Sequence, residues 1–176
     1  ELAEQIHQAS VDLGRHIKVR STTVYGGVSK KRQIGALRRG AEIVVCEVSS
    51  HALRLGRVDE TWFEVVGFTN LSQDHLDFHA DMEDYYQAKR LLFDDRFSNS
   101  AVIFVDDEWS RRLANDTTIG VRTVSMGGDA DITAQIVSRS LAGTELTITF
   151  PDSQTRTVMV PLLGDFNGEN ALVAAG

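Results

Sequence analysis

The sequence predicts an α/β protein with a doubly wound, mostly parallel sheet and a small antiparallel meander near the C-terminus. Apolar runs typical of strands buried on both faces alternate with helical patterns along the first two thirds of the chain. After Gly128, segments with two-residue periodicity follow one another through short turns. The 176 residues are enough for one core, so we expect a single α/β domain over 1–176.

The expected elements follow in chain order. A helix over 1–13 precedes a strand over 17–24, and a short basic helix closed by Gly40 leads to a strand over 41–48. This second strand is a continuous apolar run, so we expect it to be buried on both faces. Further strands are expected at 63–70, 101–107 and 121–126, helices at 81–95 and 107–115, antiparallel strands at 131–140, 144–150 and 155–162, and the start of a helix at 168–176.

Charge is distributed unevenly along the chain. The net charge is −7, yet residues 1–45 carry eight basic and four acidic residues, a balance of +4, and the remainder has a balance of −11. Such a shift indicates an arm that faces nucleic acid or two segments of different origin, although solvated helix faces would also produce it.

The single cysteine, Cys46, excludes an internal disulfide, and its place in an apolar run predicts a buried structural thiol. No apolar run approaches the roughly 20 residues that span a bilayer, and no signal-peptide pattern opens the chain. We therefore expect a cytoplasmic protein without a membrane partner.

Two acidic and two imidazole side chains gather in TNLSQDHLDFH, directly after an apolar strand. In a parallel α/β sheet the loops at the carboxyl ends of strands line the ligand crevice. His75, Asp77 and His79 could therefore bind a metal or position a phosphate. The alternative is a polar loop in which Asp77 and Asp81 cap a helix.

Two further ionisable residues occupy unusual places. Glu47 ends an apolar strand, a position that often presents an acid to a metal ion on a nucleotide phosphate. Lys89 falls on the apolar stripe of the helix at 81–95, where a bare ammonium is costly unless it is paired or reaches outward to water. A modification that removes or inverts its charge is the other explanation, and spacing alone does not choose between them.

Three long motifs carry a resemblance to a known family. EVSSHALRLGRV, FTNLSQDHLDFHADMEDYYQAKRLLF and LLGDFNGENALVAAG resemble the central ATPase domain of Mur ligases over about 46–176. Within this family the sequence resembles the UDP-MurNAc-tripeptide synthetases, which add the third amino acid to UDP-MurNAc-dipeptide in peptidoglycan synthesis. It implies a P-loop NTPase-like fold, with Mg²⁺ and ATP as cofactors and UDP-MurNAc-peptide as the substrate.

The resemblance also implies roles at matching positions. Lys89 matches a lysine that is carbamylated by CO2, and the carbamate would bridge toward the metal. The other implied residues are the magnesium ligands Glu47 and His75, the substrate contacts Ser49 and Arg57, and the adenine-side contacts Asn167 and Asn170.

The first 45 residues resemble a different family. ELAEQI, TTVYGGV and QIGALRRGAEIVV are similar to the first RecA-like domain of a DEAD-box RNA helicase, in which Gly26 and Gly27 would line the RNA path. The sequence is therefore interpreted as a chimera, natural or engineered, of a helicase-like segment (1–45) and a Mur-ligase segment (46–176). Thr22 and Thr23 also fit a Thr-Thr pair that contacts the sugar-peptide substrate in Mur ligases.

No G-x-x-x-x-G-K-[ST] motif occurs in the chain, so we expect a fold that lacks the phosphate-loop strand. The expectation is a catalytically incomplete domain that binds neither Mg²⁺ nor ATP tightly. An exposed sheet edge left in this way could pair with another copy and form a homodimer.

Two alternatives stay open beside the inactive ligase-derived domain. One is a structural recombination product without any ligand. The other is an RNA-binding module, which a negative net charge disfavours, and which would use the basic residues Lys30, Lys31, Arg32, Arg38 and Arg39.

Overall fold

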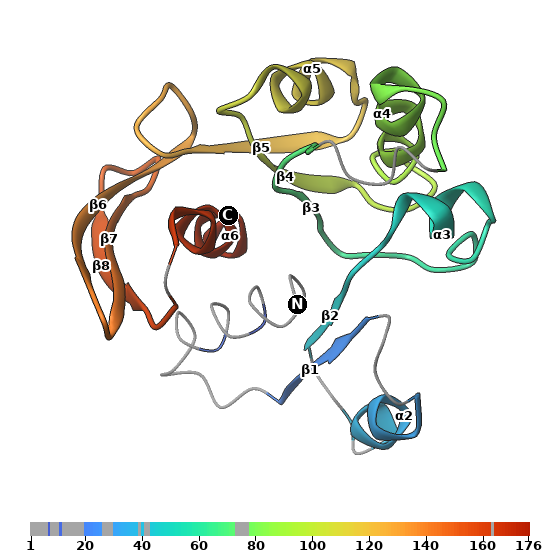
Figure 1. The fold of residues 1–176 in the computed structure, drawn as a ribbon, viewed down its shortest axis with the longest axis horizontal. Coiled ribbons are helices and arrows are strands. Elements are labelled where there is room, and N and C mark those ends of the chain that lie inside the picture. Colours follow the sequence, from blue (N-terminus) through green and yellow to red (C-terminus); the bar gives the residue numbers. More distant parts are fainter. Residues whose placement is uncertain are drawn as a thin grey trace.

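The computed structural model describes residues 7, 11, 20–25, 30–38, 40, 43–72, 78–162 and 164–176. Its strands form two sheets, a two-stranded one and a six-stranded one with the order β3-β4-β5-β6-β7-β8. The larger sheet curves around helix α6, while α4 and α5 cover its opposite face (Figure 1). This confirms the predicted α/β class with helices on both faces of a mixed sheet.

The N-terminal unit consists of β1 (Ser21–Val24), α2 (Lys30–Arg38) and β2 (Ile43–Cys46). The two strands pair in parallel, with Thr22 opposite Val44, so the predicted strands at 17–24 and 41–48 share a sheet where they are described. α2 ends as expected at Gly40, which has a φ of +82° and donates its N–H to Leu37 O at 2.9 Å. Of the helix predicted at 1–13, the structure describes His7 and Val11, both helical.

The predicted burial of β2 is wrong. Ile43 and Val44 are 45% and 47% exposed, and Cys46 is an exposed thiol, not a buried structural one. The reason lies in the sheet order, because β2 pairs with β1 and with no other described strand. The buried clusters are instead built on the six-stranded sheet and its helices.

The larger sheet changes from parallel to antiparallel along its width. β3, β4, β5 and β6 pair in parallel, and β6, β7 and β8 form the predicted antiparallel meander. The meander is not a separate unit, because Val124 of β5 pairs with Ile132 of β6. The strands are β3 (Val66–Phe68), β4 (Ser100–Phe104), β5 (Gly120–Ser125), β6 (Ile132–Ser140), β7 (Gly143–Thr149) and β8 (Thr155–Val160).

Side-chain caps begin two of the covering helices. Asp81 accepts a hydrogen bond from Asp84 N at 2.8 Å, which confirms the capping alternative for Asp81, and Asp107 accepts one from Ser110 N at 2.9 Å. The described helices of this part are α3 (Ser50–Arg54), α4 (Met82–Arg90), α5 (Glu108–Asp116) and α6 (Asp165–Ala175). α3 was not among the expected elements.

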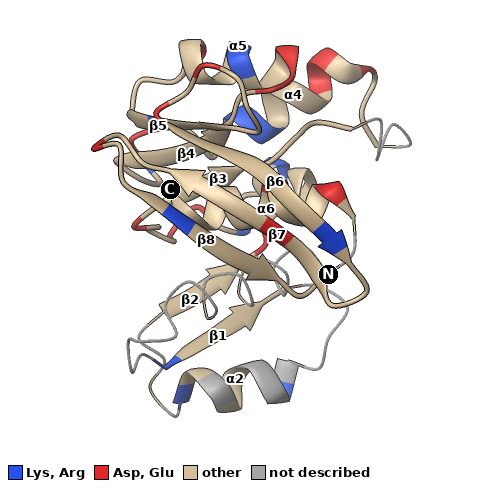
Figure 2. Ribbon diagram, turned by 90° about the vertical axis from the view of Figure 1, so that its left-hand side faces the viewer, with Lys and Arg blue, Asp and Glu red and all other residues tan. Residues whose placement is uncertain are grey.

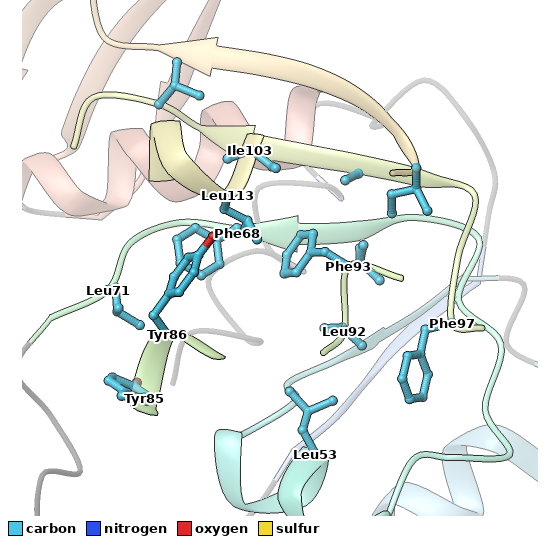
Figure 3. Packing of buried hydrophobic residues seen from close by; sticks show 14 residues of the cluster. Leu53, Phe68, Leu71, Tyr85, Tyr86, Leu92, Phe93, Phe97, Ile103 and Leu113 are labelled. Carbon is cyan, nitrogen blue, oxygen red and sulfur yellow. The ribbon is translucent and has the colours of Figure 1, made fainter. Parts of the chain in front are cut away.

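Two apolar clusters hold the helices on the sheet. The first joins Tyr86 of α4 and Leu113 of α5 to Phe68 and Ile103 of the parallel strands (Figure 3). The second surrounds α6 and includes Leu172. Each large side chain that is fully buried in this way contributes about 1.5–3 kcal/mol. Within the described residues, no helix is long and apolar enough to cross a membrane.

Candidate functional site

A pocket of about 140 Å³ lies between β2 and β3, two strands that do not pair with each other. Residues 45–48 form one wall, and residues 65–70 and part of α4 form the other. Glu47 and Lys89, which the sequence separates by more than forty positions, both line this pocket. The structure therefore brings together the acid and the lysine that were singled out for metal and carbamate chemistry.

Lys89 reaches the pocket from the last turn of α4. Its Nζ donates to Val48 O at 3.4 Å and lies 6.0 Å from the centroid of the Tyr85 ring. Burial lowers the pKa of Lys89 below its ordinary value, and the nearby Glu47 carboxylate opposes that shift. A larger share of the amine is therefore neutral, and hence nucleophilic, than for a solvated lysine.

Glu47 and Ser49 follow β2 directly. Glu47 N donates to Val24 O at 3.0 Å, which extends the β1–β2 ladder by one residue and leaves an exposed carboxylate at the carboxyl end of the strand. Ser49 caps α3, because its Oγ accepts from Ala52 N at 3.2 Å. Arg57 lies just beyond this helix with an exposed side chain.

Thr22 and Thr23 occupy the centre of β1 and are half-buried. They lie opposite Val44 and Val45, so the threonine pair stands beside the strand that leads to Glu47. Because successive side chains of a strand point to opposite faces, only one of the two can face a given ligand directly.

Several predicted site residues lie outside the described part of the chain: His75, Asp77, Gly26 and Gly27. Among the residues that are described, no three His, Cys, Asp or Glu side chains come close enough to hold a metal ion. Glu47 is thus the described member of the magnesium pair that the resemblance implies.

His79 is not placed to bind a metal or a phosphate. Its side chain is fully buried, and both ring nitrogens are engaged: Nδ1 with Asp84 Oδ2 at 3.0 Å and Nε2 with Ser50 Oγ at 2.9 Å. The sequence-based expectation for this histidine is therefore wrong. Sequence spacing could not reveal the engagement, because Ser50 lies 29 positions away.

Asn167 and Asn170 lie elsewhere, on the buried face of α6, where they are 4% and 5% exposed. Neither lines the pocket between β2 and β3. The first turns of α6 face the ends of β4 and β5, and there the pKa of Glu169 is raised by burial and by the carboxylates of Asp106, Asp165 and Asp107.

Sequence reasoning missed the polar residues at this second location. Asp106 accepts from Ser125 Oγ and from Met126 N, the latter at 2.9 Å. The backbone of Gly128 packs closely against Ser125, since a Cβ at position 128 would lie 2.5 Å from Ser125 Oγ. The signal was present in the run AVIFVDD, where two acids end a buried strand as Glu47 ends β2.

Comparison with known proteins gives a consistent result. The model of the Mur ligase middle domain matches residues 6–176. A UDP-N-acetylmuramoyl-L-alanyl-D-glutamate--2,6-diaminopimelate ligase of Streptomyces coelicolor is 46% identical over 138 residues, which are 77% of this chain and 27% of that protein. The enzyme of the same name from Corynebacterium efficiens is 39% identical over 165 residues, 92% of this chain and 31% of the relative.

Solved structures agree in fold. A ligase with the same name superposes with a TM-score of 0.79 at 26% identity, covering 98% of this chain and 39% of that one. The MurF ligase of Thermotoga maritima in complex with ADP superposes with a TM-score of 0.72 at 16% identity, covering 98% and 41%. The matched region of the chain spans less than a third of the length of the Streptomyces coelicolor and Corynebacterium efficiens ligases.

The matches bear on the segment for which a helicase origin was expected. The family match begins at residue 6, and an alignment that covers 92% of the chain includes most of residues 1–45. Residue 46 therefore marks no limit of the similarity, and these matches support neither a helicase segment nor a chimera. The Thr-Thr pair of β1 belongs to the region that resembles Mur ligases.

Proposed function

The chain belongs to the Mur ligase family, and from this premise we propose that it forms the nucleotide- and metal-binding part of an ATP-dependent ligase that adds the third residue to UDP-MurNAc-dipeptide. The observation that carries the proposal is the shared pocket of Glu47 and Lys89. An acid at the carboxyl end of a strand and a partly desolvated lysine meet there, and a carboxylate in that position can hold a metal ion that assists phosphoryl transfer.

The Glu47 carboxylate fits Mg²⁺ and is the donor that the described residues supply. Mg²⁺ prefers oxygen ligands, keeps several waters and uses one or two carboxylates together with substrate phosphates. Glu47 offers an exposed carboxylate, and His75 is proposed as a further ligand from the family resemblance. When bound, the ion would neutralise charge that develops on the transferred phosphoryl group.

Carbamylation of Lys89 is proposed from the family resemblance, and the surroundings of its amine are compatible with it. The neutral amine forms an N–C bond to CO2 and releases a proton, so a lowered pKa favours the reaction. The product is an anion, which would face the Glu47 carboxylate and the Val48 carbonyl. A divalent cation is needed to offset that repulsion, and without one we expect Lys89 to remain an unmodified amine.

Substrate and nucleotide contacts are proposed for the remaining residues. Ser49 offers a hydroxyl just beyond β2, Thr22 or Thr23 offers another from β1, and the exposed guanidinium of Arg57 suits a carboxylate or phosphate of UDP-MurNAc-dipeptide. For the adenine we propose Asn167 and Asn170 on the strength of the family resemblance, since both are buried on α6 and their amide groups can donate and accept hydrogen bonds.

Turnover is not proposed for these 176 residues alone. They contain no G-x-x-x-x-G-K-[ST] loop, and without one the main clamp on a triphosphate is missing. We therefore expect the isolated chain to bind Mg²⁺ and ATP weakly and to hydrolyse no ATP. RNA binding by α2 is not proposed, because the basic residues that are coloured on that helix in Figure 2 belong to a chain of net charge −7.

Calorimetric titration of the chain with UDP-MurNAc-dipeptide tests the proposal. We expect measurable binding that Arg57→Ala weakens by about tenfold, the loss typical of one charge-assisted hydrogen bond. Arg96→Ala is the matched control, because Arg96 is also an exposed arginine, and its partner, Asp94, lies two residues away. Equal affinities for the two variants, or no heat of binding to the unmodified chain, would contradict the assignment.

A further inference from the structure

Four side chains connect α3 to the start of α4. The imidazole of His79 lies between Ser50, the first residue of α3, and Asp84 in the first turn of α4. Arg54, the last residue of α3, forms an ion pair with the same Asp84 carboxylate. The hydrogen bond from His79 is the largest cause that lowers the pKa of Asp84. The Asp84 carboxylate thus holds the end of the five-residue helix α3 directly, through Arg54, and its beginning through His79.

The order Ser50–His79–Asp84 is that of a hydrolytic triad, yet the structure does not support a nucleophile here. Ser50 is 0% exposed and His79 is 3% exposed, so neither can meet a substrate carbonyl. Stacking of His79 on Tyr85, with ring centroids 5.0 Å apart, further fixes the imidazole plane. What remains for the three residues is to hold elements in place.

The elements that they hold carry the pocket. Glu47 and Ser49 immediately precede Ser50, and Lys89 lies five residues after Asp84 on α4. Lys89 Nζ also donates to Val48 O, so α4 contacts the segment 48–54 at its beginning, through His79 at Ser50, and at its end. β2 itself makes no such contact, because this exposed strand contributes no residue to either buried cluster.

We infer that His79 is a positioning residue: its imidazole joins Ser50 to Asp84 and thereby sets Glu47 and Val48 against Lys89 in the pocket. The inference rests on the proposed function only for what the pocket binds. The restraint itself is a property of the chain without ligands.

Amide hydrogen exchange tests the restraint. In Ser50→Ala and in Asp84→Asn, we expect the amides of residues 52–57 to exchange at least about tenfold faster, while those of β4 keep their rates, because only a local opening becomes easier. Asp94→Asn is the matched control, since Asp94 is another partly exposed carboxylate whose partner is Arg96. Unchanged exchange at 52–57, or equal acceleration throughout the chain, would overturn the inference.

A second readout separates positioning from support of the fold. The chain has four lysines. After their amines are dimethylated with an isotope label, the magnetic resonance signal of Lys89 can be resolved, and Lys89→Arg assigns it. At one fixed pH, we expect its chemical shift in Asp84→Asn to move toward those of solvated lysines, and to stay unchanged in Asp94→Asn. A Lys89 signal that ignores Asp84→Asn would show that the network does not position the pocket.

The tautomer of His79 gives a spectroscopic check. Asp84 can only accept, so the neutral imidazole must carry its proton on Nδ1, with Nε2 facing the Ser50 hydroxyl. Nitrogen-15 spectra at pH 8, assigned by His79→Gln, should show a protonated Nδ1; a proton on Nε2 would overturn the network. Failure of UDP-MurNAc-dipeptide to bind, with these three results intact, would instead count against the proposed function alone.

Discussion

Lys89 sits where an apolar residue is expected, and the structure shows how the charge is managed. The side chain lines the pocket beside Leu92 and Phe93 and bonds to a backbone carbonyl. Burial still lowers the pKa of Lys89, so the charged side chain destabilises the folded state at neutral pH.

That cost predicts a pH-dependent effect of Lys89→Met. The folded-state pKa lies below the ordinary value of 10.5, so between the two values the unfolded chain binds more protons and stability rises with pH. Below the lowered pKa the full penalty applies. Lys89→Met should therefore raise the free energy of unfolding most at pH 7, and the gain should shrink as the pH approaches 10.5. Urea unfolding at several pH values measures this.

Lys31→Met is the control for the same experiment, because Lys31 is an exposed lysine of α2. Its replacement should change the free energy of unfolding by less than about 0.5 kcal/mol, with no trend across the pH range. A Lys89→Met variant that is less stable at pH 7 than the unmodified chain would show that the ammonium is well paired.

At this scale the sequence predicted some contacts and missed others for identifiable reasons. Glu47 and Lys89 were both assigned to the metal site by the family resemblance, and they line one pocket. Cys46 was expected to be buried, but a residue's burial depends on which strand covers it, and β2 has one neighbour among the described strands. His79 was grouped with metal ligands because its partners, Ser50 and Asp84, become visible only in three dimensions.

Elements were predicted best where periodicity is long. β4, β6, β7 and β8 and helices α4 and α5 all fall within their predicted ranges to within one residue, because β4 is a continuous apolar run and the others carry several turns or alternations of pattern. α3 escaped prediction because five residues make little more than one helical turn. The parallel pairing of β6 with β5 also escaped, since register between separate strands is a tertiary property.

The turn between β6 and β7 offers a test at the scale of elements. Gly143 has a φ of +132°, and a Cβ there would lie 2.1 Å from Val160 O on β8. Gly143→Ala should therefore lower the free energy of unfolding by more than about 1 kcal/mol, since it adds a backbone clash to the strain of a positive φ. Thermal unfolding followed by circular dichroism measures the loss.

Gly127→Ala provides the matched control. Gly127 also has a positive φ, +98°, but a Cβ there would meet nothing within 4 Å. The difference between the two variants isolates the contact with β8 from backbone strain. Equal losses would mean that the end of β8 moves aside to accept the methyl group, and that the pairing of β7 with β8 is loose at that end.

At the scale of the whole molecule, the two sheets leave edges unpaired. β2 and β3 each have one strand neighbour in the described part of the chain, and a pocket lies between them. Ile43 N donates to the carbonyl of Arg20, just before β1, and Glu47 N donates to Val24 of β1. By the alternation of a parallel strand, the N–H groups of Val44 and Cys46 therefore point to the open edge. The sequence predicted an open edge, but not that β2 would also expose its apolar side chains.

An open edge with exposed apolar residues favours pairing with a second copy of the chain. A two-fold axis would place the two β2 strands antiparallel, each supplying the same residues. We therefore predict that the 19.4 kDa chain forms a homodimer whose apparent mass, measured by light scattering, falls toward the monomer value on dilution. Val44→Lys should weaken this dimer strongly, because lysine on an edge strand opposes pairing. Ile34→Lys on α2 changes an equally exposed apolar residue, 45% against 47%, away from the edge, and should leave the mass unchanged. A monomer at all concentrations, or equal loss in both variants, would rule out pairing through β2.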